Sequence, residues 1–361
     1  MKAVFAGGGT GGHITPALAL ADALKRVSDN PEILFFGSSG KLEETMVPGN
    51  GYQIQLIKIS GFNRRNIIKN ISLPFKILSS VNKCKSVLRK FKPDVVIGTG
   101  GYVSAPVVYA AIKLKIPVLL QEGNSLPGMV TKMFCDKADR VIVNFEDTLN
   151  YLKRRDNAMV IRHPIRYISE KANKDDSLKF FELKPGLKTL FVFGGSQGSV
   201  SLNNAIKKIL PGLYKLDINL IWQTGETKIE EIKKIAEPFK ERVKVLSFIH
   251  KMDIAYSASD LVVCRAGISS IAELAVFKMP VILVPFPYAS ENHQEKNARS
   301  LEKEGAAVVL TDNELGEKLL NTIDEIIFDN AKLDIMSGNI AKYSDAESSN
   351  KIVNEILKIL K

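Results

Sequence analysis

Short apolar runs alternate with amphipathic segments from the first residues of the chain onward. In the first half, the runs that we expect to be buried strands are residues 4–6, 33–36, 95–97, 118–120 and 140–143. Between them, residues 17–27 and 103–114 carry apolar side chains at helical spacing. Strands that alternate with helices predict an α/β fold, with a parallel sheet covered by helices on both faces.

The second half of the chain starts the same pattern again. Residues 189–193 form an apolar run followed by glycines and a helical pattern, and further strands are expected at residues 219–222, 243–245, 261–263 and 281–284. The polar segment 171–185 is the expected junction. The chain is therefore predicted to form two doubly wound domains. Its last residues, 351–361, have the spacing of a surface helix, but periodicity does not say which domain that helix closes.

Length and composition agree with a two-domain globular protein. The chain has 361 residues, of which 45% are hydrophobic and 25% charged. Three separated cysteines exclude a disulfide framework and a CxxC pair, and they suggest a reducing compartment. The opening residues do not read as a signal peptide, and no run approaches the roughly 20 apolar residues of a membrane span.

The positive charge is concentrated in the first half of the chain. Residues 1–160 carry 22 basic and 12 acidic side chains, whereas residues 161–361 carry 28 and 27. The stretch from Lys58 to Lys92 holds ten basic residues and no acidic one. Such one-sided charge attracts an anionic partner, which can be nucleic acid, anionic lipid or polyphosphate.

Within that basic stretch the apolar residues are mostly aliphatic. A nucleic-acid face would need aromatic side chains for base stacking, and Phe75 is nearly alone. Aliphatic side chains beside lysines favour contact with an anionic membrane surface, and no nucleic-acid partner is expected. The alternative is an ordinary helix with a solvated basic face.

A glycine loop with a histidine at its end follows the first strand. Residues 7–12 read Gly-Gly-Gly-Thr-Gly-Gly and lead through His13 into a helix. Glycines let backbone amides approach a phosphate, and the helix N-terminus favours negative charge. Binding of NAD by a dehydrogenase is poorly supported, because Glu32 precedes its strand instead of ending it. His13 is the candidate general base, with a capping or packing histidine as the alternative.

Two further glycine loops have the same strand–turn–helix context. Residues 98–102, with Gly100, Gly101 and Tyr102, follow a strand, and Glu122 and Asn124 end the next one. Residues 194–198, with Gly195, Ser196, Gln197 and Gly198, open the second half. Because open α/β sheets bind ligands at the carboxyl ends of their strands, we expect these loops to hold a diphosphate and its partner substrate. Arg166, near the junction, is a candidate for neutralising a phosphate, and a solvated surface arginine is the alternative.

The segment 264–273 suits the nucleoside part of a nucleotide. Small residues after the strand leave room for a flat base, and the carboxylate of Glu273 on the following helix is able to accept two ribose hydroxyls. Polar amides in the segment 290–298 suit sugar hydroxyls, although a polar helix start explains them equally well. No Asp-x-Asp motif lies in a suitable turn, so we expect no metal and no cofactor.

Six segments together resemble the bacterial peptidoglycan N-acetylglucosaminyltransferases, the MurG family of glycosyltransferase family 28. In order they are GGGTGGHITPALALA, GTGGYVSAPVVYAA, QEGNSLPG, FVFGGSQGS, VVCRAGISSIAEL and NHQEKNA. The resemblance implies a GT-B fold, in which two Rossmann-like domains face each other across a cleft. It divides the chain into residues 1–163, which bind acceptor and membrane, residues 164–340, which bind UDP-N-acetylglucosamine, and a helix at 341–361 that packs back on the first domain.

The same resemblance implies the activity and its residues. The enzyme is expected to transfer N-acetylglucosamine, with inversion, to the 4-hydroxyl of lipid I on the cytoplasmic face of the membrane. Other cell-wall synthesis proteins are its expected partners. His13 and Glu122 are the expected catalytic residues, and the expected donor contacts are Thr10, Gly11, Gly12, Asn124, Arg166, Ser196, Ile249, Ile268, Ser269, Ser270, Glu273 and Gln294.

One segment departs from the family pattern. Gly-Asn-Pro usually precedes the Arg166 position, whereas this chain has Arg162-His163-Pro164, so an extra positive group near the cleft is expected. The rival functions are another GT-B enzyme, either a glycolipid glycosyltransferase or a UDP-N-acetylglucosamine 2-epimerase, the NAD-dependent dehydrogenase, and a non-catalytic nucleotide-binding regulator.

Overall fold

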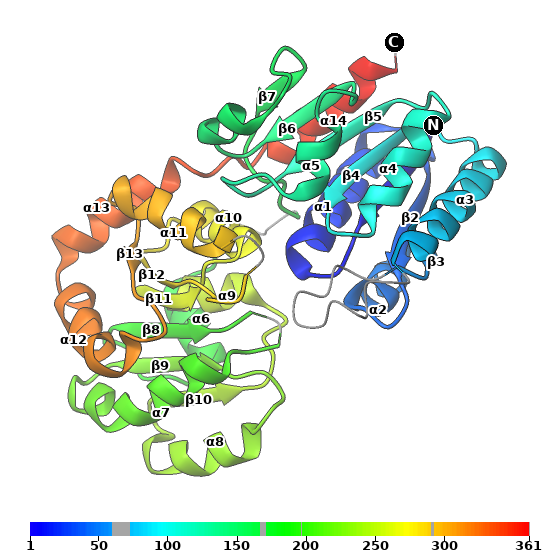
Figure 1. Ribbon diagram of the computed structural model, residues 1–361. Helices are drawn as coiled ribbons and strands as arrows, with labels where there is room; N and C mark the ends of the chain where they lie inside the picture. Colours follow the sequence, from blue (N-terminus) through cyan, green and yellow to red (C-terminus); the bar gives the residue numbers. More distant parts are fainter. Residues whose placement is uncertain (60–72, 167–170, 196, 290–291, 361) are drawn as a thin grey trace. The chain divides into compact units, whose positions relative to one another are not determined.

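The computed structural model describes residues 1–59, 73–166, 171–195, 197–289 and 292–360 (Figure 1). The chain divides into two compact units. Unit 1 comprises Met1–Tyr167 and Asp345–Lys361, and unit 2 comprises Ile168–Ser344. Each unit is described by itself.

Unit 1 is built on a sheet of parallel strands in the order β3-β2-β1-β4-β5-β6-β7. The strands are β1 (Lys2–Gly7), β2 (Glu32–Ser38), β3 (Gln53–Ile57), β4 (Val95–Gly100), β5 (Val118–Glu122), β6 (Arg140–Val143) and β7 (Ala158–Val160). The strand order reverses between β1 and β4. This is the switch point at which doubly wound sheets bind their ligands.

Helices cover both faces of this sheet, because successive side chains of each strand point to opposite sides. Ala3 and Phe5 of β1 pack with α1 and α14, whereas Val4 and Ala6 pack with α3, α4 and α5. The helical segments are α1 (Gly11–Val27), α2 (Leu42–Gly49), α3 (Leu73–Phe91), α4 (Ser104–Lys113), α5 (Met129–Phe134), the 3₁₀ turn η2 (Glu146–Tyr151) and α14 (Ser348–Ile359).

Unit 2 repeats the topology with the order β10-β9-β8-β11-β12-β13. Its strands are β8 (Thr189–Phe193), β9 (Asn219–Gln223), β10 (Val243–Leu246), β11 (Leu261–Arg265), β12 (Val281–Val284) and β13 (Val308–Val309). Its helices are α6 (Lys174–Phe180), α7 (Val200–Lys215), α8 (Ile229–Ala236), the 3₁₀ turn η3 (Glu237–Phe239), α9 (Met252–Ala258), α10 (Ile268–Val276), α11 (His293–Lys303), α12 (Leu315–Ile327) and α13 (Asn330–Ala341). Its switch point lies between β8 and β11.

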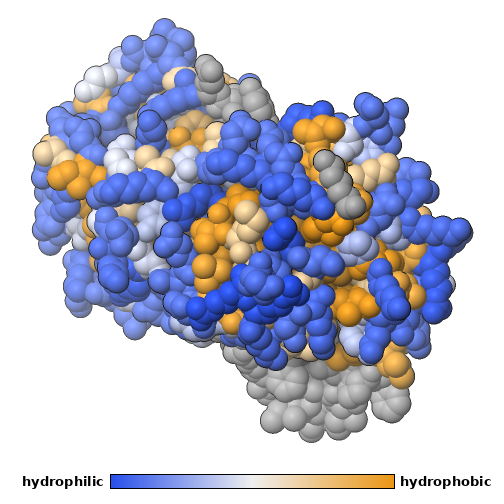
Figure 2. All heavy atoms as spheres, turned by 90° about the horizontal axis from the view of Figure 1, so that it is seen from above, coloured by the Kyte–Doolittle hydropathy of each residue, from blue (hydrophilic) through white to orange (hydrophobic). Residues whose placement is uncertain are grey.

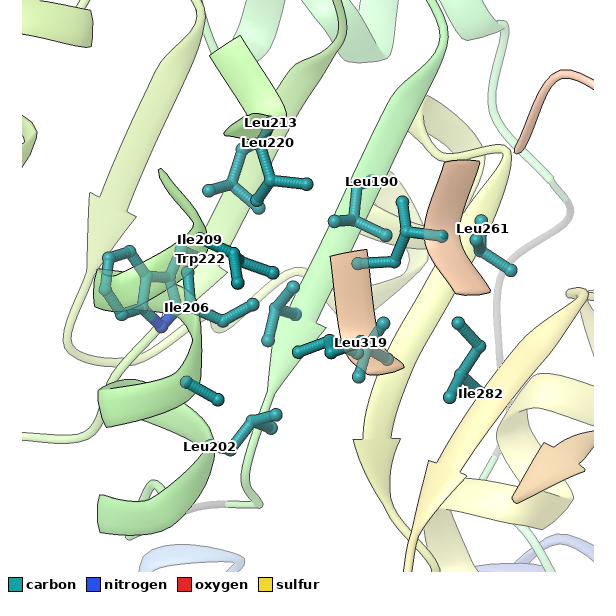
Figure 3. Packing of buried hydrophobic residues seen from close by; sticks show 14 of the residues in the cluster. Leu190, Leu202, Ile206, Ile209, Leu213, Leu220, Trp222, Leu261, Ile282 and Leu319 are labelled. Carbon is teal, nitrogen blue, oxygen red and sulfur yellow. The ribbon is translucent and has the colours of Figure 1, made fainter. Parts of the chain in front are cut away.

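The core of unit 2 also has two layers. On one face, Leu190 and Trp222 pack among aliphatic side chains of α7 and α12 (Figure 3). The Trp222 indole donates a hydrogen bond to Asn203 Oδ1 at 3.0 Å, so its polar atom is satisfied inside the core. On the other face, Phe191 and Phe193 contact Tyr256 of α9.

The α/β prediction and the expected strands are confirmed, and each predicted strand coincides with a described one. Strands β3, β7 and β13 and helix α2 were not predicted, because they are short or only partly apolar. The segment 171–185, which we expected to be a polar junction, contains the helix α6. Asn173 caps this helix, and Leu178 on it is buried. The terminal helix α14 packs against α1 in unit 1.

The three cysteines are free and buried. Among the residues that the structure describes, no helix is both long and apolar enough to cross a membrane.

Candidate active site

Two glycine loops meet at the switch point of unit 1, and only glycines permit so close an approach. A Cβ on Gly101 would lie 2.1 Å from the carbonyl oxygen of Gly8, and one on Gly100 would lie 2.6 Å from Nδ1 of His13. Both glycines have positive φ, +78° and +105°. Tyr102 lies over Gly9, where an added Cβ would be 3.0 Å from its ring. The predicted loop residues are therefore brought together at one edge of the sheet.

His13 is oriented by the second loop. Its Nδ1 lies 3.0 Å from the carbonyl oxygen of Thr99, and the Thr99 hydroxyl donates to the carbonyl of His13 at 2.7 Å. Because a carbonyl oxygen only accepts, Nδ1 carries the hydrogen and the neutral ring has its lone pair on Nε2. This is the tautomer that a general base acting through Nε2 requires.

The start of α1 is open on its surface. Thr10 is the N-cap residue and is exposed, and its side chain makes no capping hydrogen bond. A Cβ on Gly11 would meet nothing within 4 Å. The first amides of a helix have no partner inside the helix and carry partial positive charge. Gly11 and Gly12 thus present donors where a ligand is able to approach.

A buried glutamate binds the first glycine loop from the interior of unit 1. Glu43 is fully buried and accepts hydrogen bonds from the amides of Gly9, at 3.1 Å, and Ser38, at 3.0 Å. It is the first acidic residue after β2. In a dinucleotide-binding unit the acidic residue near this strand end binds a ribose, whereas here it binds the loop. Because the Gly9 amide already donates to this carboxylate, whose negative charge repels anions, binding of a phosphate to that amide is disfavoured.

Glu122 organises the loop that carries Asn124. Its carboxylate accepts from the amide of Asn124 at 3.0 Å, the Asn124 side chain at 3.2 Å, the amide of Gly128 at 2.8 Å and the hydroxyl of Thr131 at 2.8 Å. Glu122 is 5% exposed. This geometry supports a structural role in shaping the loop, and the predicted catalytic role stays a prediction.

Arg166 is bound within unit 1. Its guanidinium donates twice to Asp22 Oδ2, at 2.7 and 2.9 Å, and once to Asn50 Oδ1 at 2.6 Å. Asp22 lies three turns along α1 from the glycine loop, a rise of about 16 Å. The structure therefore does not bring Arg166 to that loop. A diphosphate contact by Arg166 requires an exchange of these partners.

In the segment 162–164, which departs from the family pattern, His163 adds no positive charge. His163 is 3% exposed, and its amide donates to Asn144 Oδ1 at 2.8 Å. Burial, together with the nearby His13, lowers the pKa of His163 to about 3. The ring is therefore neutral at physiological pH. Arg162 donates to the Asn144 carbonyl at 3.0 Å, so both residues support this turn.

The third glycine loop lies at the switch point of unit 2. The Gly198 amide donates to the Gly195 carbonyl at 2.9 Å, and Gln223 Nε2 donates to the same oxygen at 2.9 Å. A Cβ on Gly198 would lie 1.9 Å from the Thr224 carbonyl, whereas one on Gly195 would meet nothing within 4 Å. The loop is packed on one side and open on the other, with Gln197 exposed. The predicted residue Ser196 lies outside the described residues.

Ile268, Ser269 and Ser270 form the first turn of α10, next to this loop across the sheet edge. Glu273 follows one turn later and accepts a hydrogen bond from the Tyr256 hydroxyl at 3.0 Å. Burial raises the pKa of Glu273 to about 7, partly offset by that hydroxyl. Desolvation also keeps the pKa of Tyr256 well above its usual value, so Tyr256 remains the donor.

Two further predicted residues lie at the carboxyl edge of this sheet. Ile249 follows β10 and is 5% exposed. Gln294 lies in the first turn of α11, and its Oε1 accepts the amide of Phe286 at 2.9 Å. The amide nitrogen of Gln294 then remains the group with which it could donate to a ligand.

Sequence reasoning missed the side chains that hold these loops, namely Glu43, Thr99, Tyr256 and Arg265. Arg265 carried the clearest signal, because a charged residue ends an otherwise apolar strand. Within the described residues, no group of three or more His, Cys, Asp or Glu side chains is placed to hold a metal ion.

Comparison with known proteins gives matches along the whole chain. Residues 3–143 match the N-terminal domain model of glycosyltransferase family 28, and residues 189–353 match its C-terminal domain model. A curated relative from Listeria monocytogenes serotype 4b is 40% identical, with 100% of each chain covered. One from Flavobacterium psychrophilum is 37% identical over 99% of this chain and 98% of its own. Both are named UDP-N-acetylglucosamine–N-acetylmuramyl-(pentapeptide) pyrophosphoryl-undecaprenol N-acetylglucosamine transferase.

Solved structures agree in fold. Acinetobacter baumannii MurG superposes with a TM-score of 0.78 at 27% identity, covering 99% of both chains. The UDP complex of S. aureus MnaA has a TM-score of 0.69 at 15% identity, covering 99% of this chain and 96% of its own. The second match shows the shared architecture alone.

The raised pKa of Glu273 predicts a specific dependence of stability on pH. Between about pH 4.5 and 7 the folded protein keeps a proton that the unfolded chain has released, so this group's contribution to stability falls as pH rises through that window. Glu273→Gln should remove that decline, so the variant gains stability relative to wild type from pH 5 to pH 8. Chemical unfolding of both proteins at several pH values measures this.

Glu325→Gln, an exposed position on α12, is the matched control and should leave the pH profile unchanged. Parallel profiles for wild type and Glu273→Gln would contradict the prediction.

Proposed function

Because the chain belongs to the peptidoglycan N-acetylglucosaminyltransferases of glycosyltransferase family 28, we propose that it transfers N-acetylglucosamine from UDP-N-acetylglucosamine to lipid I. The acceptor is N-acetylmuramyl-(pentapeptide)-pyrophosphoryl-undecaprenol, and the product is lipid II of peptidoglycan synthesis. The observation that carries the proposal is the end-to-end match, at 37–40% identity, to relatives named for this reaction. The protein is thus a hexosyltransferase.

The reaction is a single displacement with inversion at the anomeric carbon. The 4-hydroxyl of the muramyl sugar attacks, and UDP leaves. Nε2 of His13 takes the proton of the attacking hydroxyl, in keeping with the tautomer that Thr99 imposes. Around it, the first amides of α1 at Gly11 and Gly12, with Thr10 and Asn124, suit the hydroxyls of a sugar. Glu122 holds Asn124 in place for that contact.

Unit 2 holds the donor nucleotide. The backbone at Ile249 and the first turn of α10 receive the uracil, and Glu273 accepts the ribose hydroxyls. The loop amides of Gly195 and Gln197, with Ser196, bind the diphosphate and stabilise the charge that develops on it as UDP leaves. Gln294 donates to a sugar hydroxyl. Arg166 joins the diphosphate only when it has left Asp22.

The rival functions have less support. A dehydrogenase needs an acidic side chain available to a ribose after β2, whereas Glu43 is fully buried and bound to the glycine loop. A 2-epimerase needs acidic catalytic groups, whereas Glu43 and Glu122 are both committed to backbone amides.

Unit 1 also provides the membrane contact, through the face formed by α3, α4 and α5. Ile77 and Leu78 of α3 and Met129 and Met133 of α5 are exposed, at 43%, 61%, 61% and 50%. Lys76 and Lys90 of α3 are exposed as well. Apolar side chains beside cations suit an interface with anionic headgroups, where each nearby cation contributes roughly 1 kcal/mol.

The rest of the basic stretch, residues 60–72, lies outside the described residues. Figure 2 shows hydrophobic patches among the hydrophilic residues on the face that it presents. We propose that the protein is peripheral to the cytoplasmic face of the membrane, where the lipid-linked acceptor is reached, and that its protein partners are other cell-wall synthesis enzymes.

A transfer assay tests the function directly. The purified protein is mixed with radiolabelled UDP-N-acetylglucosamine and lipid I in vesicles, and the label should appear in a lipid-soluble product only when lipid I is present. UDP-glucose replaces the donor as control and should give at least about tenfold less product, the usual cost of one lost sugar contact. Label converted without an acceptor would indicate an epimerase and would overturn the proposal.

Replacing the general base should separate chemistry from binding. His13→Ala should lower the turnover number by about 10²–10⁴-fold, the typical contribution of a positioned base. The dissociation constant for UDP, measured by calorimetry, should stay within about threefold, because the nucleotide contacts lie in unit 2. Equal losses in turnover and in UDP affinity would argue against the assigned role.

Charge reversal on α3 should weaken membrane binding. The double variant Lys76→Glu/Lys90→Glu should bind vesicles containing anionic lipid at least about tenfold less tightly, as measured by cosedimentation. The matched control Lys215→Glu/Lys303→Glu changes net charge equally on exposed positions of unit 2 and should bind like wild type. A similar loss in both double variants would mean that net charge alone, and not the α3 face, drives binding.

A further inference from the structure

Arg265 ends β11 at the switch point of unit 2 and is 8% exposed. Its guanidinium donates to the hydroxyls of Ser199, at 2.8 and 3.1 Å, and of Ser201, at 2.6 Å. It also donates to Asp312, at 2.6 and 3.2 Å, and to the carbonyls of Val284 and Pro285, at 3.3 and 3.1 Å. One side chain thus ties together three segments at the same sheet edge.

These contacts use the guanidinium on every side. All three nitrogens donate, and the carboxylate of Asp312 balances the charge. A buried arginine without such partners would be strongly destabilising. Because its donors are engaged and its charge is paired, Arg265 has the role of positioning other protein groups and does not add positive charge to a ligand site.

The groups that it holds shape the third glycine loop. Ser199 is the N-cap residue of α7, and its hydroxyl accepts the amide of Leu202 at 3.4 Å. Gly194 packs directly against it, since a Cβ on Gly194 would lie 2.4 Å from the Ser199 nitrogen. The position of Ser199 therefore fixes Gly194, while a side chain on the next residue, Gly195, would extend into open space.

We infer that Arg265, with Asp312, is a positioning residue that sets the glycine loop of unit 2 for the diphosphate of the donor. This inference rests on the proposed function, because that function assigns the diphosphate to this loop. Arg265 does not touch the ligand. It holds Ser199 and Ser201, and through them the loop amides, in the arrangement that a diphosphate requires before it binds.

A lysine cannot replace the guanidinium here. Lysine keeps the positive charge for Asp312 but offers one nitrogen in place of a planar fork, so it cannot reach Ser199, Ser201 and the two carbonyls together. Ser199→Ala removes one held group without any change of charge. The two variants therefore disturb the same geometry, and neither changes the net charge.

Calorimetric titration with UDP and with uridine distinguishes the outcomes. Arg265→Lys and Ser199→Ala should each weaken UDP binding by about tenfold, whereas uridine, which lacks phosphates, should bind within about twofold of wild type. The dependence of UDP affinity on ionic strength should be the same in all three proteins, because no charge next to the diphosphate changes.

Arg242→Lys is the matched control. Arg242 is also buried in unit 2, 6% exposed, and is paired with Asp217 and the Tyr214 carbonyl at the opposite end of the sheet. Its replacement should lower thermal stability without changing UDP affinity. If Arg265→Lys does not fold, Ser199→Ala and Ser201→Ala carry the same measurement.

Three results would overturn the inference. Wild-type UDP affinity in Arg265→Lys or in the serine variants would remove the positioning role. Equal weakening of UDP and uridine would indicate general damage to unit 2. A loss confined to Arg265→Lys, with an altered salt dependence, would mean direct contact with the phosphates.

Failure of wild-type protein to bind UDP would instead overturn the proposed function itself, and the role of the loop with it.

Discussion

The close approach of backbone to backbone at the glycine loops is the constraint on which the candidate site depends. In unit 1 the space between Gly8 and Gly101 admits no side chain, and in unit 2 the same holds between Gly198 and Thr224. Loops packed this tightly have little freedom to move, so their amides keep a fixed direction. A preorganised set of donors stabilises developing charge without a cost of reorganisation at the moment of reaction.

Buried charged side chains complete this arrangement, and they do so by binding backbone and hydroxyl groups. Glu43 and Glu122 each accept amides of the loops of unit 1, and Arg265 donates to the start of α7 in unit 2. Each ion is compensated by hydrogen bonds or by a counter-ion, without which burial of charge would be costly. Loops that carry the predicted substrate contacts are thus held by residues that need not touch any substrate.

The sequence predicted the longer apolar strands, the two α/β domains and the glycine loops, because those depend on local periodicity and on the turn chemistry of glycine. It did not predict the loop contact of Glu43 or the role of Arg265, because the partners lie far along the chain: Glu43 and Gly9 are 34 residues apart, and Arg265 and Asp312 are 47 residues apart. Nothing in the local pattern distinguishes the buried Glu43 from the neighbouring half-buried Glu44. The binding state of Arg166 was likewise beyond sequence reasoning, since its partner Asp22 lies 144 residues away.

The reciprocal bonds between His13 and Thr99 join positions 86 residues apart. Any residue at position 99 supplies the carbonyl that orients the imidazole, but only a hydroxyl-bearing one returns a hydrogen bond to the backbone of position 13. A chimaera of two homologous enzymes with its crossover between these positions therefore takes position 13 from one parent and position 99 from the other. Such recombinants should remain functional only where both parents carry a matching pair, so these two segments are expected to be inherited together.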